Sequence, residues 1–160
     1  MSGTRPRYDF GLISCTNRKN PQGMTARTLY TGGVFATQMR HAQQRCGQIL
    51  IMSAKFGLLR PEDQVSYYDA YLPELPPQMR VRLIARMKEQ AQRLIWDRMP
   101  DGQLPTILSY LPKAYAEAFT EADDLLGNLM RRPYKHHAML PLTALLSAEI
   151  ETYGTLEQRR

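Results

Sequence analysis

Short apolar segments alternate with helical segments along this chain, and no other feature constrains its fold as strongly. Three segments have the length and apolar character of buried strands: residues 8–15 (YDFGLISC), 48–53 (QILIMS) and 104–110 (LPTILSY). Three segments have helical spacing of apolar residues: 25–45, with a break at Gly32-Gly33, 77–99 and 112–126. Strands that alternate with helices predict a mostly parallel sheet covered by helices on both faces.

The remaining segments complete this prediction. Residues 54–77 combine aromatic, proline and acidic residues and predict a structured loop. Residues 128–133 predict a basic loop, 134–140 a weak fourth strand and 143–153 a closing helix. There is no internal repeat and no linker long enough to divide the chain. We therefore expect one three-layer α/β domain over residues 1–160, with about four strands and a core over residues 8–153.

The composition excludes several classes of protein. A chain of 160 residues with 43% hydrophobic and 22% charged residues is typical of a globular domain and not of a disordered chain. No apolar run approaches the roughly 20 residues of a membrane span, and no apolar signal core follows the N-terminus. Cys15 and Cys46 are too few for a disulfide framework and lack a metal-ligand spacing. We expect a cytoplasmic protein without membrane contact.

The charge is unevenly distributed along the chain. Residues 1–60 hold nine Lys/Arg and one acid, a net +8, whereas residues 61–160 hold twelve Lys/Arg and fourteen acids, a net −2. A basic first third favours an anionic partner such as nucleic acid, a nucleotide or phosphate. A basic surface that only maintains solubility would give the same pattern. Arg82, Arg86 and Arg93 also share one helix face, which is more often solvated than a binding surface.

A candidate site follows from the predicted sheet, because ligands of open parallel sheets bind outside the carboxyl ends of the strands. Each predicted strand ends in a small hydroxyl residue with a lysine nearby. The candidate binding residues at these strand ends are Ser14, Thr16, Asn17, Lys19, Ser53, Gly57, Ser109 and Tyr110. Hydroxyls, backbone amides and ammonium groups in one crevice suit a phosphate or a polar heterocycle. Alternatively, each serine only caps the next turn or helix.

Four residues are candidates for catalysis. Cys15 is either a nucleophile favoured by nearby basic residues or a small core residue. Lys55 is either an anion-binding group or an amine nucleophile. Tyr68 could stack on a base or hydrogen-bond to it, and Asp69 could move a proton or bind a hydroxyl. An acid in a tyrosine-rich loop can equally serve a turn or a salt bridge.

Other reaction classes lack their motifs. The chain contains no P-loop, GxGxxG, HExxH or GxSxG sequence. His136 and His137 are adjacent, and neighbouring residues on a strand point to opposite faces. We therefore predict no metal site and no cofactor.

The same segments resemble a bacterial and phage family of YaaA-like proteins, usually described as a domain of unknown function. The matching elements are Ser14-Cys15 with Lys19, then Ala26-Arg27-Thr28-Leu29-Tyr30, then Ser53-Ala54-Lys55-Phe56-Gly57-Leu58-Leu59 with Pro61 and Tyr68-Asp69. The resemblance covers residues 8–72 well, and the SAKFGLL segment with Tyr-Asp is its specific part. It adds Arg27 and Tyr30 to the binding candidates. The chain departs from the pattern at Tyr67, where a proline usually precedes Tyr-Asp.

Two more distant similarities bear on function. Peroxide-stress YaaA proteins are similar around residues 56–63, which implies DNA binding, although their helix-hairpin-helix element has no convincing counterpart here. The central domain of archaeosine synthase has a similar Cys-Ser…Lys loop, which implies tRNA base modification. We therefore expect an enzyme that acts on a nucleobase or glycosidic bond of a nucleotide or nucleic acid. The alternatives are a non-catalytic nucleic-acid-binding protein and a small-molecule sensor.

Overall fold

The fold is built around two neighbouring apolar strands, as the sequence predicts. The structure is a computed structural model that describes residues 6–15 and 19–132. β1 (Tyr8–Ser14) is the central strand, and its residues Leu12 and Ile13 are fully buried. β2 (Cys46–Ser53) runs parallel to β1, with Ser14 opposite Met52 at the carboxyl end. Strands covered on both faces read as nearly continuous apolar runs, which explains why both are visible in the sequence.

Over the described residues, the sheet has five strands in the order β3-β2-β1-β4-β5. β4 (Ile107–Ser109) pairs parallel to β1, and β5 (Met130–Arg131) pairs parallel to β4. β3 (Gly57–Leu59) pairs antiparallel to the end of β2. The prediction of an α/β domain with a mostly parallel sheet and helices on both faces is therefore confirmed, with one antiparallel edge strand.

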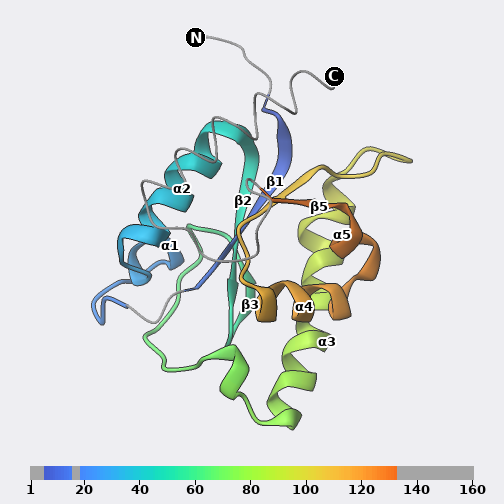
Figure 1. The fold of residues 1–160 in the computed structure, drawn as a ribbon. Coiled ribbons are helices and arrows are strands. Elements are labelled where there is room, and N and C mark those ends of the chain that lie inside the picture. The colour runs from blue at the N-terminus through green and yellow to red at the C-terminus, as the bar shows by residue number, and fades with distance from the viewer. Residues whose placement is uncertain (1–5, 16–18, 133–160) are drawn as a thin grey trace.

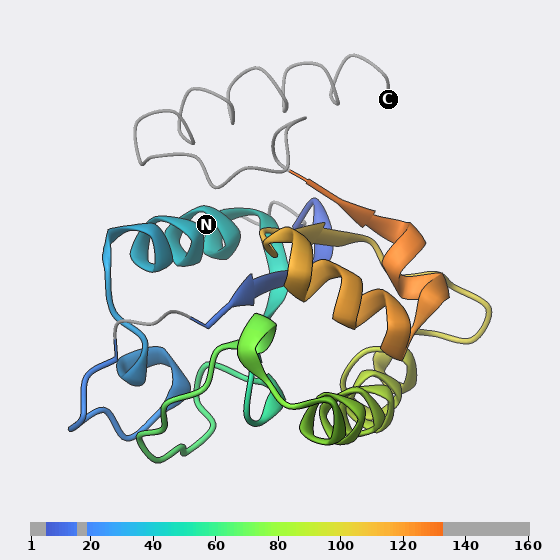
Figure 2. The same ribbon diagram turned by 60° about the horizontal axis from the view of Figure 1, so that its bottom comes forward.

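Helices cover the two faces of the sheet from opposite sides (Figures 1 and 2). α2 (Gly33–Arg45) packs on β1 and β2. Gly11 permits this close packing, because a Cβ there would lie 3.4 Å from the Ala42 Cβ of α2 and 2.9 Å from the Cys46 Sγ at the start of β2. α3 (Pro77–Leu94) packs on β3 and against α4 (Lys113–Ala122) on the other side. In the described part of the chain, one hydrophobic core connects these layers.

Several predicted boundaries change in the structure. The break at Gly32-Gly33 separates α1 (Ala26–Leu29) from α2, as expected. The predicted helix 77–99 ends at Leu94 and is followed by the short helix η2 (Trp96–Arg98). The predicted helix 112–126 is two helices, α4 and α5 (Asp124–Leu129). Asp123 separates them, because its backbone is extended and its carboxylate caps α5 through the Leu126 N–H.

Two loop predictions were wrong. Residues 54–77 contain the strand β3 and the short helix η1 (Leu72–Glu74). Residues 128–131 of the predicted basic loop belong to the end of α5 and to β5. The predicted strand 134–140 and closing helix 143–153, with His136 and His137, lie outside the described residues. Within the described ranges, no helix is long and apolar enough to cross a bilayer.

Candidate functional site

A hollow of about 450 Å³ opens directly after the carboxyl end of β2. The turn after β2, the loop before η1 and one side of α3 form its walls. It is lined by Ala54, Lys55, Tyr68, Asp69, Ala70, Leu75, Met79, Arg82, Leu83 and Arg86. The structure therefore brings three of the four predicted catalytic residues, Lys55, Tyr68 and Asp69, to one concave site.

Hydrogen bonds from two side chains, one at the end of β2 and one on α3, fix the turn that carries Lys55. The Ser53 hydroxyl accepts hydrogen bonds from the N–H groups of Lys55 (3.1 Å) and Phe56 (3.0 Å). From α3, the Gln90 amide accepts from the Leu58 N–H (2.8 Å) and donates to the Phe56 carbonyl (3.0 Å). Lys55 is exposed, but these bonds fix its backbone at the edge of the hollow.

Gly57 serves this turn through its backbone. Its φ of +78° lies in the left-handed region, and a Cβ there would lie 2.2 Å from the Gln90 Oε1. Any side chain at this position would displace Gln90. Gly57 does not line the hollow, so its contribution is to shape the turn that presents Lys55.

α3 presents two rows of side chains to the hollow, one apolar and one cationic. Met79 and Leu83 are four residues apart, and so are Arg82 and Arg86, so each pair lies on one line along the helix. The Arg86 guanidinium also donates to the Lys55 carbonyl at 3.3 Å. The sequence predicts that these arginines share one side of a helix, but it does not predict that the hollow lies against that side. The structure places Arg82 and Arg86 in the site, whereas Arg93 is not among the lining residues.

A buried group of three hydroxyls lies behind the hollow. The Tyr68 phenol oxygen is 2.5 Å from that of Tyr30 and 2.7 Å from the Ser53 Oγ. Burial raises the pKa of Tyr30 to about 12, against the opposing effect of its hydrogen bonds to Ser53 and Tyr68. Burial, with the nearby Cys15 and Tyr30, raises the pKa of Tyr68 far above its usual range. Both phenols therefore stay protonated near neutral pH.

Two lysines approach the same tyrosine ring. The Lys19 Nζ lies 4.7 Å from the Tyr68 ring centroid, and the Lys55 Nζ lies 5.9 Å from it. Lys19 is half-buried and is not among the residues that line the hollow. Tyr68 thus links the two predicted lysines, although only Lys55 faces the hollow.

Cys15 lies in the interior and not in the hollow. Its side chain is 8% exposed, and its Sγ lies 3.4 Å from the Tyr115 hydroxyl on α4. Burial and the proximity of Cys15 raise the pKa of Tyr115 above its usual range. This contact joins the end of β1 to α4, which is a packing role.

The end of β4 does not reach the hollow. Ser109 is buried, and its hydroxyl accepts from the Leu111 N–H at 3.2 Å. Tyr110 is fully buried, and its hydroxyl bonds to the Nδ1 of His41 on α2. Ser14 is buried in the pairing of β1 with β2. Thr16 and Asn17 lie outside the described residues.

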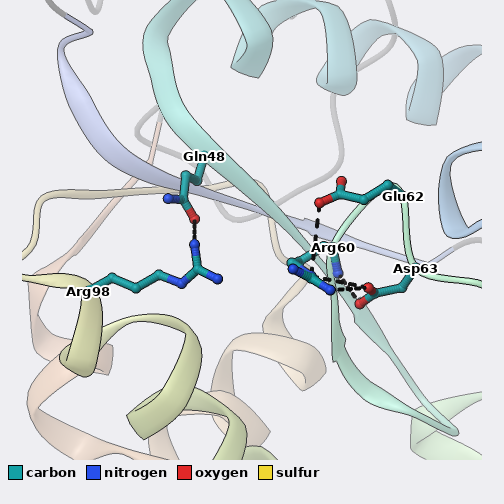
Figure 3. A network of polar contacts seen from close by, with 5 residues as sticks. All are labelled: Gln48, Arg60, Glu62, Asp63 and Arg98. Atoms are coloured by element: carbon teal, nitrogen blue, oxygen red, sulfur yellow. Dashed lines mark hydrogen bonds and ion pairs between the residues drawn. The ribbon is translucent and has the colours of Figure 1, made fainter.

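Arg27 has a backbone role beside the site. Its N–H donates to the Pro61 carbonyl (2.9 Å), and the Ala26 N–H donates to the Asp63 carbonyl (2.9 Å), while the Arg27 side chain is exposed. The Arg60 guanidinium donates to the Asp63 carboxylate at 3.0 and 3.1 Å and lies 3.9 Å from the Glu62 carboxylate. Figure 3 shows these contacts within the turn. The same figure shows Arg98 donating to Gln48, which joins η2 to β2.

The side chains of the hollow are chemically mixed. Among the described residues, no His/Cys/Asp/Glu group of three or more is arranged to hold a metal ion. The hollow combines three cations and one carboxylate with apolar side chains from the loop and from α3. This combination can hold an anionic ligand that also has an apolar part.

Comparison with known proteins identifies the family of the chain. Residues 11–140 match a family of unknown function (DUF6884). The chain belongs to this family. The matched residues include the second half of β1, the Lys55 turn, Asp69 and both α3 rows. No curated protein and no solved structure matches the chain. The resemblance to YaaA-like proteins therefore stays a prediction.

Proposed function

We propose that the hollow binds a nucleotide, free or within a nucleic acid, and that the protein acts on its base or glycosidic bond. One observation carries this proposal: Lys55, Arg82, Arg86 and Asp69 converge on a hollow with apolar walls at the carboxyl end of a parallel strand. That edge is where open α/β sheets bind their ligands. A nucleotide has the matching combination of an anionic phosphate and a flat base with apolar faces.

The proposed roles follow from the chemistry of each side chain. Guanidinium groups bind phosphate oxygens through paired hydrogen bonds, and the Lys55 ammonium adds a positive charge. Asp69 is the carboxylate in the hollow and would accept a proton or bind a sugar hydroxyl. In hydrolysis of a glycosidic bond, water would add to the anomeric carbon and give its proton to Asp69. The base would leave with the bonding electrons and take up a proton from solvent.

The buried tyrosines take a different role from the one expected of them. Tyr68 is only 5% exposed, and its hydroxyl already bonds Tyr30 and Ser53. We therefore assign Tyr68 as a positioning residue for its neighbour Asp69. Cys15 is left out of the proposed chemistry because it is buried against Tyr115.

Product analysis tests this proposal. The protein is incubated with DNA, RNA and a nucleotide pool, and products are followed by mass spectrometry. We expect product from the wild type and a loss of at least about tenfold in rate in Lys55→Ala and Asp69→Asn. Lys88→Ala and Asp101→Asn are matched controls, since both residues are exposed and neither lines the hollow. No wild-type product, or undiminished product in both site variants, would overturn the proposal.

A second candidate is a nucleic-acid-binding protein without catalysis, as the similarity to YaaA proteins implies. The net +8 of residues 1–60 favours it. It predicts that affinity for DNA or RNA falls with a log–log salt slope of about one per phosphate contacted. A gel-shift titration at several salt concentrations measures this slope. The expected slope, together with the absence of any product, would favour this candidate. Binding that does not respond to salt would exclude it.

A further inference from the structure

The two rows on α3 constrain how a ligand lies in the hollow. Within each row the two residues are one turn apart, so each row extends about 6 Å along the helix axis. The apolar row, Met79 and Leu83, runs beside the cationic row, Arg82 and Arg86. A ligand in contact with both rows therefore needs an apolar face next to an anionic edge.

The apolar row continues into an apolar wall. Ala54, Ala70 and Leu75 line the hollow together with Met79 and Leu83. Leu83 is 4% exposed, which places it in the wall, whereas Met79 is 51% exposed and lies at the surface. An intact duplex offers phosphates and groove edges but keeps the faces of its bases stacked, so it gains nothing from this wall. A base that has left the stack can place its apolar face against this wall.

The cationic row is available to a ligand. Among the described residues, no carboxylate forms an ion pair with Arg82 or Arg86, whereas Arg80, also on α3, pairs with Glu121 on α4. Arg86 is directed toward the hollow by its hydrogen bond to the Lys55 carbonyl. The row can therefore accept an anion without first breaking an internal salt bridge.

The size and aromatic content of the hollow limit the ligand to one nucleotide unit. A volume of about 450 Å³ is in the range of sites for single small ligands. Proteins that bind long single strands use exposed aromatic rings as stacking platforms. Here the aromatic ring of the hollow, Tyr68, is 5% exposed and packs edge-on against Phe56 at 5.2 Å.

We propose that the hollow takes one nucleotide unit, with its phosphate on the Arg82–Arg86 row and its base on the Met79–Leu83 row. This inference rests on the proposed function and adds the orientation and the form of the substrate. A nucleotide within a duplex must leave the stack before it enters.

Calorimetric titration of the full chain tests the inference. The probes are the common ribo- and deoxyribonucleoside 5′-monophosphates, the matching nucleosides, inorganic phosphate and a fully paired duplex. We expect at least one monophosphate to bind at least about tenfold more tightly than both its nucleoside and phosphate. The double variant Arg82→Ala/Arg86→Ala should lose the preference for the monophosphate over the nucleoside, and Arg93→Ala should keep it. Met79→Ser should weaken binding of the monophosphate but leave phosphate binding unchanged.

Three results would overturn the inference. They are no binding of any monophosphate, equal affinity for nucleoside and monophosphate, and duplex binding that monophosphates do not displace. Failure of the proposed reaction is a separate outcome: a monophosphate would bind with the expected dependence on both rows, but no product would form. Conversely, product formed in the hollow without monophosphate binding would leave the reaction standing and remove this inference.

Discussion

The phenol oxygens of Tyr30 and Tyr68 lie 2.5 Å apart in the interior. Tyr30 follows α1, and Tyr68 lies in the loop that leads to η1. The Ser53 hydroxyl at the end of β2 is 2.7 Å from Tyr68 and extends this contact to a third segment. The loop that carries Asp69 is thus fixed by buried hydrogen bonds to two elements of the fold.

Replacing Tyr68 with phenylalanine should destabilise the protein. The change removes both hydrogen bonds and leaves two buried hydroxyls with fewer partners, at a cost of about 1–3 kcal/mol in the free energy of unfolding. Urea denaturation measures this cost. Tyr67→Phe is the matched control, because Tyr67 is 54% exposed and should change stability by less than about 0.5 kcal/mol. Equal stabilities of the two variants would show that the buried contact contributes nothing.

Replacing Gly57 with alanine should disturb the turn beneath Lys55. The backbone strain at φ +78° and the displacement of Gln90 together should cost about 2–3 kcal/mol. Gly102→Ala separates these effects, because Gly102 has φ +76° but no atom within 4 Å of its Cβ position. It should cost only about 1 kcal/mol. If thermal or chemical denaturation finds equal costs, the Gln90 contacts do not stabilise the turn.

Acid should destabilise the fold through His41. Burial, followed by the charge of Arg45, lowers the pKa of this imidazole from 6.5 to about 3. Between pH 6.5 and pH 3 the unfolded chain binds a proton that the folded chain does not, so stability falls as the pH falls. The contribution of this one group approaches about 1.4 kcal/mol per pH unit. Denaturation at several pH values, compared with His41→Gln, isolates it. A wild-type slope no steeper than that of the variant would contradict this assignment.

Mutation of Arg60 should have little effect, despite its several contacts in Figure 3. The side chain of Arg60 is 44% exposed, and solvent screens its ion pairs with Glu62 and Asp63. Arg60→Ala should therefore cost no more than about 1 kcal/mol. Urea denaturation at low and high salt checks this value. A larger loss that disappears at high salt would mean that the ion pairs hold the turn.

The parts of the fold that the sequence predicts are those with a strong local pattern. β1 and β2 are continuous apolar runs, and α3 has apolar residues at three- to four-residue spacing. β3 and β5 have three and two residues, which is too short for any periodicity to show. β3 depends on pairing with β2, and β5 depends on the free edge of β4. Such pairing is tertiary and leaves no local signal.

The same distinction applies to the site. Ser53 and Lys55 could be predicted as site residues because they follow a strand, and open parallel sheets bind their ligands at the carboxyl ends of the strands. The sequence also placed Ser109 and Tyr110 there, but Tyr110 turns toward His41, and no local pattern reveals which face a side chain takes after a strand ends. Gln90 was missed because its contacts are to the backbone of a turn more than thirty residues away. Helical spacing grouped Arg82 with Arg86, but it could not show that the loop carrying Asp69 lies across the hollow from them.

The central claim is that a nucleotide occupies the hollow, and the methyl group of Met79 reports on this directly. Methionine-methyl NMR of the full chain, with the Met79 and Met24 signals assigned by substitution, is recorded while a nucleoside monophosphate is added. Met79 lines the hollow, whereas Met24 is 74% exposed and belongs to a separate surface. We expect the Met79 signal to shift to saturation and the Met24 signal to stay in place. A stationary Met79 signal under all common nucleoside monophosphates, or equal shifts at both methyl groups, would contradict the account.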